Sequence, residues 1–352
     1  MTALLPHVSS EKLSELDQRL RGISKLSVDY IILLCSSSLI ASLGLFQNSP
    51  AVIIGAMIVA PLMRPLMGLS LSVITAETKL LYQSLITLVL GTIFGFSISW
   101  LMGKCLGFIV ITSEILNRTH PNLLDLGVAI VAGMVGAYCQ TSSKLADSLA
   151  GVAIAVALVP PLCVVGIGFA LHEQSIWTGA LLLYATNMVG ITFAGALVFF
   201  SLGYTPLNQA RKGLFISAIS VLLLIVPLAY SMHELVLENQ LSSKIQKILK
   251  RTQTFKGLYL QDVEVKLFRK PMSVVATVIS SQPQISSKQV KLVQDFLQKE
   301  TNRSISFKLR IIKAEEISAV ELTTEDSVPF TPFQPIEPRR NFPILDQTSS
   351  SP

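Results

Sequence analysis

Charged residues are scarce in this chain of 352 residues. Asp, Glu, Lys and Arg make up 14% of it, hydrophobic residues make up 51%, and the mean hydropathy is +0.58. Soluble proteins carry about 25% charged residues, so an ordinary soluble protein is excluded. The composition instead predicts an integral protein of the cell membrane, with the lipid bilayer as its main partner.

Motifs for catalysis, metals and nucleotides are also lacking. The four cysteines show no CxxC spacing and the four histidines no HExxH pattern, so we expect neither a disulfide framework nor a metal site. No GxxxxGK[ST] or GxSxG sequence occurs, and no basic cluster is interleaved with aromatic residues. We therefore expect no enzymatic activity, no cofactor and no nucleic-acid partner.

Long apolar segments are what the chain does have. Each approaches or exceeds the roughly 17–25 residues that a helix needs to cross a bilayer. Seven such segments lie at about 30–46, 50–76, 80–102, 123–139, 148–171, 176–202 and 214–232. The predicted fold is a polytopic α-helical membrane protein with about seven spans.

Other segments are predicted to flank a transmembrane domain at 29–233. Leucines at helical spacing predict an amphipathic helix within 1–28. Apolar and polar residues alternate near 263–267 and 305–311, so 234–318 is predicted to form a helix and a small soluble α+β domain. Residues 319–352 are rich in Pro, Ser and Thr and are predicted to form a disordered tail.

The distribution of Lys and Arg in short connections predicts the orientation. Among the basic residues of the short connections, a cytoplasmic N-terminus places only Lys104 and Arg118 outside. The cytoplasmic side then carries Lys12, Arg19, Arg21, Lys25, Lys79, Lys144, Arg211 and Lys212. Seven crossings would put the C-terminal domain on the opposite side of the membrane.

The second apolar segment contains residues that a continuous membrane helix tolerates poorly. Pro61, Arg64 and Pro65 lie near its middle. Proline removes a backbone donor and disrupts the helix, and lipid cannot satisfy the backbone groups that are released. The segment is therefore predicted to be an interrupted helix packed against protein or a wet cavity.

The same pattern recurs later in the chain. A shift of 96 positions aligns Gly55 with Gly151 and Pro65 with Pro161, and a shift of 99 relates the third and sixth spans. We therefore predict two three-helix units, repeat A at 29–102 and repeat B at 123–202, followed by an extra span at 213–233. Three crossings per unit make the second unit inverted relative to the first.

The predicted site lies where the two interrupted helices meet near the membrane midplane. Arg64 could bind an anion there; alternatively, it reaches a lipid headgroup or pairs with Glu77 or Asp147. Asn48 could serve as a helix cap instead, and Asn187 could form an interhelical hydrogen bond. The candidate substrate-binding residues are Asn48, Gly55, Pro61, Arg64, Pro65, Gly151, Pro160, Pro161 and Asn187.

Three motifs carry a resemblance to a known family. They are the stretch from Asn48 to Leu69, the sequence Leu158-Val-Pro-Pro-Leu162 and the sequence Asn187-Met-Val-Gly-Ile191. Over roughly 29–202 the chain resembles the bacterial membrane family catalogued as domain of unknown function 389, an uncharacterised hydrophobic-domain family. The resemblance implies a polytopic membrane protein with a soluble appendage and supplies no substrate. A small residue commonly stands in that family at the position of Arg64.

Two functions from different classes fit these patterns. The leading hypothesis is a secondary transporter or channel-like permease for a small ion or solute, with anions as the first class to consider. The alternative is a membrane-anchored scaffold or sensor whose C-terminal domain binds a partner or ligand. A homo-oligomer is compatible with either hypothesis.

Overall fold

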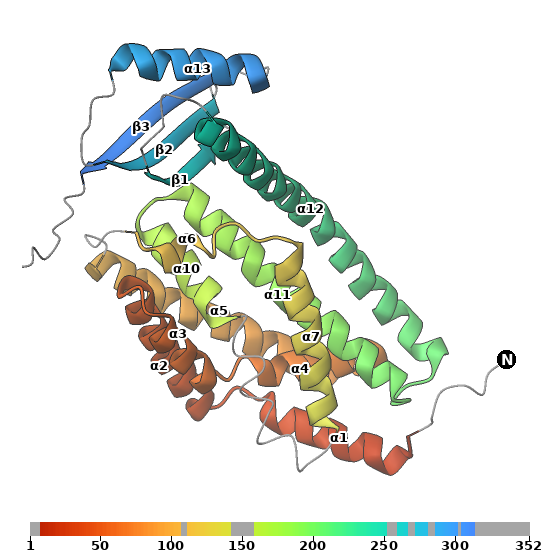
Figure 1. The fold of residues 1–352 in the computed structure, drawn as a ribbon. Helices are drawn as coiled ribbons and strands as arrows, with labels where there is room; N and C mark the ends of the chain where they lie inside the picture. The colour runs from red at the N-terminus through yellow and green to blue at the C-terminus, as the bar shows by residue number, and fades with distance from the viewer. Residues whose placement is uncertain are drawn as a thin grey trace, which may run out of the picture. The chain divides into compact units, whose positions relative to one another are not determined.

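The computed structural model describes residues 8–106, 111–141, 158–251, 259–266, 272–280, 286–301 and 304–313 (Figure 1). It divides into two compact units, Met1–Ser242 and Ser243–Pro352, which we describe separately. Gly151, Asp147 and the predicted tail at 319–352 lie outside the described residues.

The first unit is built from helices. Five of them, α2, α5, α7, α11 and α12, are long and apolar enough to cross a membrane, and the bent pair of α3 and α4 makes a sixth candidate. The helices are α1 (Ser10–Ile23), α2 (Val28–Phe46), α3 (Pro50–Val59), α4 (Met63–Thr75), α5 (Thr78–Leu106), α6 (Ser113–Leu116), α7 (Leu123–Gln140), α10 (Val159–Ala170), α11 (Gln174–Ser201) and α12 (Leu207–Arg251).

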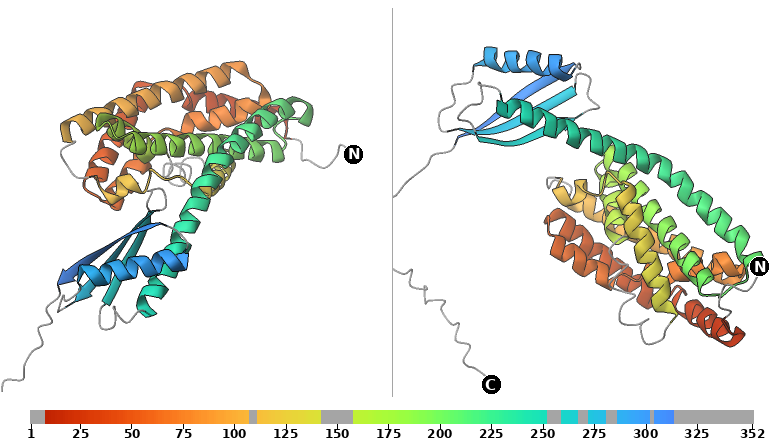
Figure 2. Two further views of the ribbon diagram at one scale, coloured as in Figure 1. Left: turned by 90° about the horizontal axis from the view of Figure 1, so that it is seen from above. Right: turned by 45° about the vertical axis from the view of Figure 1, so that its right-hand side comes forward.

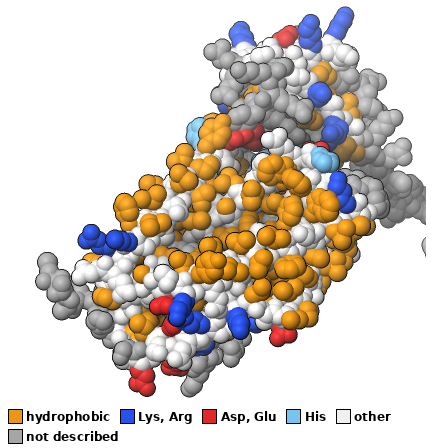
Figure 3. Space-filling view, turned by 180° about the vertical axis from the view of Figure 1, so that it is seen from behind, with side chains coloured by type: hydrophobic (Ala, Val, Ile, Leu, Met, Phe, Trp, Pro, Cys, Tyr) orange, Lys and Arg blue, Asp and Glu red, His pale blue; other side chains and the backbone are white. Residues whose placement is uncertain are grey.

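The outer surface of this unit is strongly apolar. Figure 3 shows a broad field of hydrophobic side chains on one face, with few charged side chains inside it. On α12, Leu223 is 74% exposed and Val226 is 70% exposed. Exposed apolar areas of this kind are unfavourable in water and suit the hydrocarbon of a bilayer.

The predicted interruption of the second apolar segment is confirmed. Helices α3 and α4 form a pair bent by 57° at a short break that contains Pro61. The last carbonyls of a helix lack partners within it, and the Ser37 hydroxyl of α2 donates to the Ala56 carbonyl of α3 over 2.7 Å. A neighbouring helix therefore satisfies a backbone group near the break.

A second helix with prolines begins inside the unit. Helix α10 has Pro160 and Pro161 in its first turn, and every residue from Val159 to Gly168 is buried. The first backbone N–H groups of a helix have no partner within it, and proline has no backbone N–H. The two prolines therefore remove two unpaired donors from the start of α10. The pair of prolines thus allows α10 to begin among apolar neighbours.

Glycines show how the long helices run relative to one another. On α5, Gly91 packs against Tyr30 and Gly95 against Ser38, so α5 is parallel to α2. On α7 and α11, Gly190 packs against Leu126 and Gly133 against Ile191, so these two helices are also parallel. Helices α2 and α5 therefore run in one common direction, and α7 and α11 likewise share a direction.

The shorter helices α4 and α10 pack against these long helices. A Cβ atom added to Gly166 of α10 would lie 2.7 Å from Ser99 Cβ of α5, and one added to Gly195 of α11 would lie 2.7 Å from Ser70 Oγ of α4. Gly103 of α5 also packs against Ala170, which makes α10 parallel to α5. Helix α10 thus packs on α5, and helix α4 packs on α11.

Helix α12 is longer than the sequence suggests. A span at 213–233 and a separate amphipathic helix are predicted, whereas the structure has one helix from Leu207 to Arg251. Neither glycine nor proline lies between Met232 and Arg251, so no residue favours a helix end there. Pro227 lies within the helix without ending it.

The second unit contains a three-stranded sheet and a helix. Strand β2 (Met272–Ser280) lies between β1 (Tyr259–Lys266), to which it is antiparallel, and β3 (Ile305–Lys313), to which it is parallel. Helix α13 (Ser287–Thr301) connects β2 to β3 and lies along one face of the sheet (Figure 2).

The apolar face of α13 differs from the predicted one. The sequence predicts a helix with Val290, Val293 and Phe296 on one face. Val293 is buried, but Leu297 is the second buried residue, and Phe296 is 44% exposed. Residues four apart lie on one helix face, and Leu297 fits the stripe that contains Val293 better than Phe296 does.

Candidate functional site

A polar cavity of about 370 Å³ lies within the helical unit. Two predicted site residues, Pro161 and Asn187, line it from α10 and α11. Among the described residues, the lining consists of Glu114, Asn117, Arg118, Asp125, Val128, Pro161, Leu183 and Asn187. The cavity therefore joins charged side chains to the start of the central helix α10.

The charged side chains of the cavity include an ion pair. Arg118 Nη1 lies 2.7 Å from Glu114 Oε2, one helical turn away, and also donates to the Glu114 carbonyl. The side chains are 18% and 16% exposed, respectively. Limited solvent exposure strengthens the attraction between them, and it also makes an unpaired charge costly.

Asp125 is oriented by the start of α7. Its carboxylate accepts a hydrogen bond from the Asn122 backbone N–H over 2.8 Å, and the Asn122 side chain accepts one from the Leu124 backbone N–H. This is a capping box, in which Asp125 satisfies the backbone at the start of α7. The same carboxylate also lines the cavity.

The inner end of the cavity lies deep within the unit. Asn187 is only 4% exposed, and Pro161 is two residues from Cys163. The Cys163 thiol is 3.5 Å from the carbonyl of Ser38, which lies at the middle of α2. Helix α10 therefore begins about halfway along α2.

Buried hydroxyl groups surround this region. Ser42 Oγ and Ser99 Oγ are 3.2 Å apart, one turn beyond Ser38. The hydroxyls of Ser38 and Thr186 are buried and have no hydrogen-bond partner among the described residues. Several buried hydroxyl groups thus lie close to the start of α10.

The cavity can bind small polar molecules. Arg118 and Asn187 can donate hydrogen bonds, while Glu114 and Asp125 can accept them. The start of α10 adds a partial positive charge but few N–H donors, because Pro160 and Pro161 have none. Recognition must therefore rely on side chains. Within the described ranges, no three His, Cys, Asp or Glu residues gather in a metal-binding group.

The other predicted site residues lie outside the cavity lining. Pro61 and Pro65 are buried at the break between α3 and α4, and Gly55 is exposed on α3. Arg64 is exposed, and its backbone carbonyl accepts a hydrogen bond from Ser24 Oγ over 3.1 Å. Pro160 is buried beside Pro161 in α10.

Glu77, a predicted alternative partner of Arg64, pairs with another residue. It lies 2.8 Å from Arg21 Nη2, and Arg21 also pairs with Asp17. Because Ser24 lies just before α2, its hydrogen bond to the Arg64 carbonyl places the start of α4 near the start of α2 rather than near its middle.

Asn48 reaches the edge of the cavity through α6. Its side-chain oxygen accepts hydrogen bonds from Ser113 Oγ over 2.9 Å and from the Glu114 backbone N–H over 3.0 Å. Its φ of 55° is left-handed, which asparagine tolerates better than most residues. The cap of α3 is the neighbouring Ser49, whose hydroxyl accepts from the Val52 backbone N–H.

Sequence reasoning missed Glu114 and Arg118 as site residues. Arg118 entered only as a charge that sets orientation. Opposite charges four residues apart are a signal for a local ion pair, and this pair lies in a short connection between two apolar segments. That the connection packs against α10 and α11 follows only from the fold.

Comparison with known proteins identifies the family. The sequence profile described as Domain of unknown function (DUF389) matches residues 57–193, which include every described residue of the cavity lining. An uncharacterized protein of Methanocaldococcus jannaschii is 32% identical over 222 residues, covering 60% of this chain and 68% of that protein. This relative is archaeal, so the resemblance extends beyond bacteria. The chain belongs to the family described as Domain of unknown function (DUF389).

Proposed function

We propose that this protein is a secondary transporter or channel-like permease for a small polar solute. The observation that carries the proposal is the start of α10, a buried helix that begins with two prolines beside a polar cavity. Interrupted helices that meet a polar site inside the membrane are typical of secondary transporters. A purely anchoring helix bundle has no need of such a helix start.

The helix boundaries support two related halves. Helix α7 begins at Leu123, 95 residues after Val28 of α2. Helix α10 begins at Val159, 96 residues after Met63 of α4, and α11 begins at Gln174, 96 residues after Thr78 of α5. The last pair favours a shift of 96 over the shift of 99 that residue identities suggest. Three helices thus recur in the same order at a nearly constant spacing.

The packing contacts recur after the same shift. Ser70 of α4 packs on Gly195 of α11, and the residues 96 positions away from each, Gly166 and Ser99, pack on each other. In the first contact, the first half supplies the short helix α4 and the second half supplies the long helix α11. In the second contact, the second half supplies the short helix α10 and the first half supplies the long helix α5. Such an exchange is what a two-fold relation between the halves produces.

The helix directions are consistent with inversion of the second half. Helices α2, α5 and α10 are parallel, whereas Gly168 near the end of α10 packs on Ile176 near the start of α11, as expected for an antiparallel pair. Helix α7 is parallel to α11 and hence opposite to α2. We therefore propose an inverted repeat, the arrangement that allows alternating access in many transporters.

An anion is the first solute class to test. Arg118 is the only cation in the cavity lining of the described residues, and Glu114 occupies it. An incoming anion could take the place of this carboxylate, with Asn187 as a second donor. Asp125 disfavours a second negative charge, so a small monovalent anion or a neutral polar solute fits best.

A flux screen in proteoliposomes tests the proposal. Arg118→Gln and Asn187→Leu should each lower flux about tenfold or more, because each removes a buried donor to the solute. Lys104→Gln is the matched control, since Lys104 is an exposed basic residue outside the cavity lining, and its flux should equal that of the unmodified protein.

Two outcomes would contradict the proposal. The cavity would be ruled out if both variants folded normally and carried solute at the unmodified rate. Transport itself would be ruled out if no anion, cation or neutral solute crossed faster than in protein-free liposomes. The second outcome would favour the scaffold or sensor hypothesis.

A further inference from the structure

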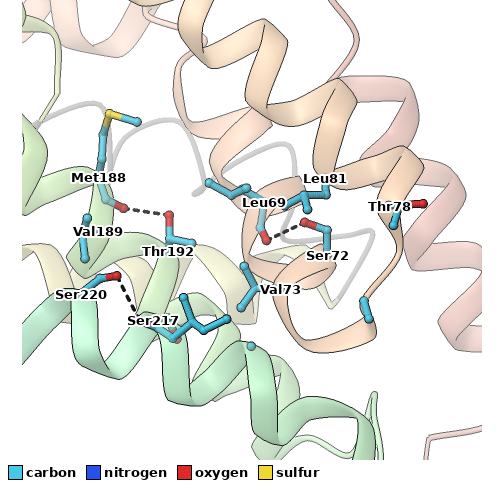
Figure 4. A pocket seen from close by; sticks show the side chains of 13 residues that line it. Leu69, Ser72, Val73, Thr78, Leu81, Met188, Val189, Thr192, Ser217 and Ser220 are labelled. Carbon is cyan, nitrogen blue, oxygen red and sulfur yellow. Dashed lines mark hydrogen bonds between the residues drawn. The ribbon is translucent and has the colours of Figure 1, made fainter.

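A second cavity, separate from the polar one, is an apolar groove of about 480 Å³. Figure 4 shows side chains from α4, α5, α11 and α12 around it. Its walls are formed largely by Leu69, Val73, Leu81, Met188, Val189 and Ile216. All of the lining residues lie in the helical unit, and three of the four helices are candidate membrane spans.

The hydroxyl groups of four lining residues are occupied within their own helices, namely those of Ser72, Thr192, Ser217 and Ser220. Ser72 donates to the Leu69 carbonyl and Thr192 to the Met188 carbonyl, each over 2.8 Å (Figure 4). Ser220 donates to the Ile216 carbonyl over 3.0 Å. The groove therefore offers methyl and methylene groups to a ligand, which suits a hydrocarbon chain and not a polar solute.

One end of the groove is flanked by basic residues. Thr78 and Gly213 line this end, and they are adjacent in sequence to Lys79 and Lys212, with Arg211 one residue further. All three basic side chains are exposed, and none forms an ion pair with a described carboxylate. The nearby Glu77 pairs with Arg21.

We propose that this groove binds one acyl chain of an anionic phospholipid, with the lipid phosphate at Lys79, Arg211 and Lys212. The surroundings select the occupant: an apolar groove between membrane helices opens to lipid, and three unpaired cations at its end favour a negative headgroup. Clusters of basic residues beside membrane helices attract anionic lipids in this way. The inference rests on the membrane location and not on transport.

Lipid binding to the purified full chain tests this site. Native mass spectrometry would compare phosphatidylglycerol with phosphatidylcholine of the same chain length. The variant Lys79→Gln, Arg211→Gln, Lys212→Gln should bind phosphatidylglycerol on the order of a hundredfold more weakly, at roughly fivefold per charge, with phosphatidylcholine unchanged. Lys104→Gln, a single change elsewhere, should keep the preference for phosphatidylglycerol.

A second variant tests the acyl chain separately from the headgroup. Ser217→Phe places a bulky ring in the groove and should weaken binding of both lipids. Glycerol phosphate, which has the charge without the chains, should not displace the bound lipid. An unchanged preference for phosphatidylglycerol in the triple variant would overturn the proposal, and displacement by glycerol phosphate would show a site for phosphate alone.

Discussion

A single hydroxyl group can satisfy the end of a helix that is buried inside the protein. Ser37 supplies such a hydrogen bond to the buried Ala56 carbonyl near the end of α3. The same task at a water-exposed helix end falls to solvent. A serine in the middle of α2 is therefore part of the structure of α3.

Replacing this serine should be more costly than replacing its neighbour. Ser37→Ala leaves the Ala56 carbonyl without its donor, and we expect a loss of about 1–2 kcal/mol in the free energy of unfolding. Ser36→Ala is the matched control, because Ser36 is only partly buried and no such bond is described for it. Thermal unfolding in detergent would measure both. Equal effects would contradict this role of Ser37.

The two arginines of the membrane region show the limits of residue-level prediction. Arg64 is conspicuous in the sequence because apolar residues and prolines surround it, yet it is exposed in the structure. Arg118 lies in a connection and attracts no attention, yet it lines the polar cavity. The sequence shows how far each arginine lies from an apolar segment, but not which helices pack against it.

Whole helices fit together at small residues. Gly133 of α7 lies so close to α11 that an added Cβ would come within 2.5 Å of the Ile191 carbonyl oxygen and 2.8 Å of Ile191 Cα. Both atoms belong to the backbone and cannot move aside without a shift of the helix. Gly127, on the same helix, has no atom within 4 Å of an added Cβ.

This pair of glycines allows a matched test of helix packing. Gly133→Ala should destabilise the protein by about 1–3 kcal/mol, because it overpacks the contact between α7 and α11. Gly127→Ala should be neutral or stabilise by a few tenths of a kcal/mol to about 1 kcal/mol, since alanine favours a helix. Unfolding temperatures in one detergent would compare the two. A neutral Gly133→Ala would show that the helices are less tightly packed than described.

At this scale the sequence predicts much of the fold. Helices α2, α5, α7 and α11 begin and end close to the predicted apolar segments because their length and composition suffice to identify them. The break near Pro61 is likewise visible in the sequence. The continuity of α12 and the inward face of α13 are not, because both depend on residues with weak local preferences.

At the scale of the whole molecule, the proposed inverted repeat predicts one path of the helical unit through the membrane. If the halves are inverted, the end of α5 and the start of α12 lie on opposite sides. Cys105 is exposed at the first position, and Arg211→Cys would provide a thiol at the second. In a background with the other cysteines replaced, a membrane-impermeant maleimide added to intact cells should label only one of the two. Labelling of both from the same side would contradict the proposed path.

The packing of α10 on α5 has a consequence for biogenesis. The surface of α5 around Gly95, Ser99 and Gly103 is covered by α10, which the ribosome makes more than fifty residues later. Until then, the newly inserted first half must hold this surface against lipid or an insertase. Residues that look like parts of a finished interface thus also determine how long an incomplete chain stays unprotected in the membrane.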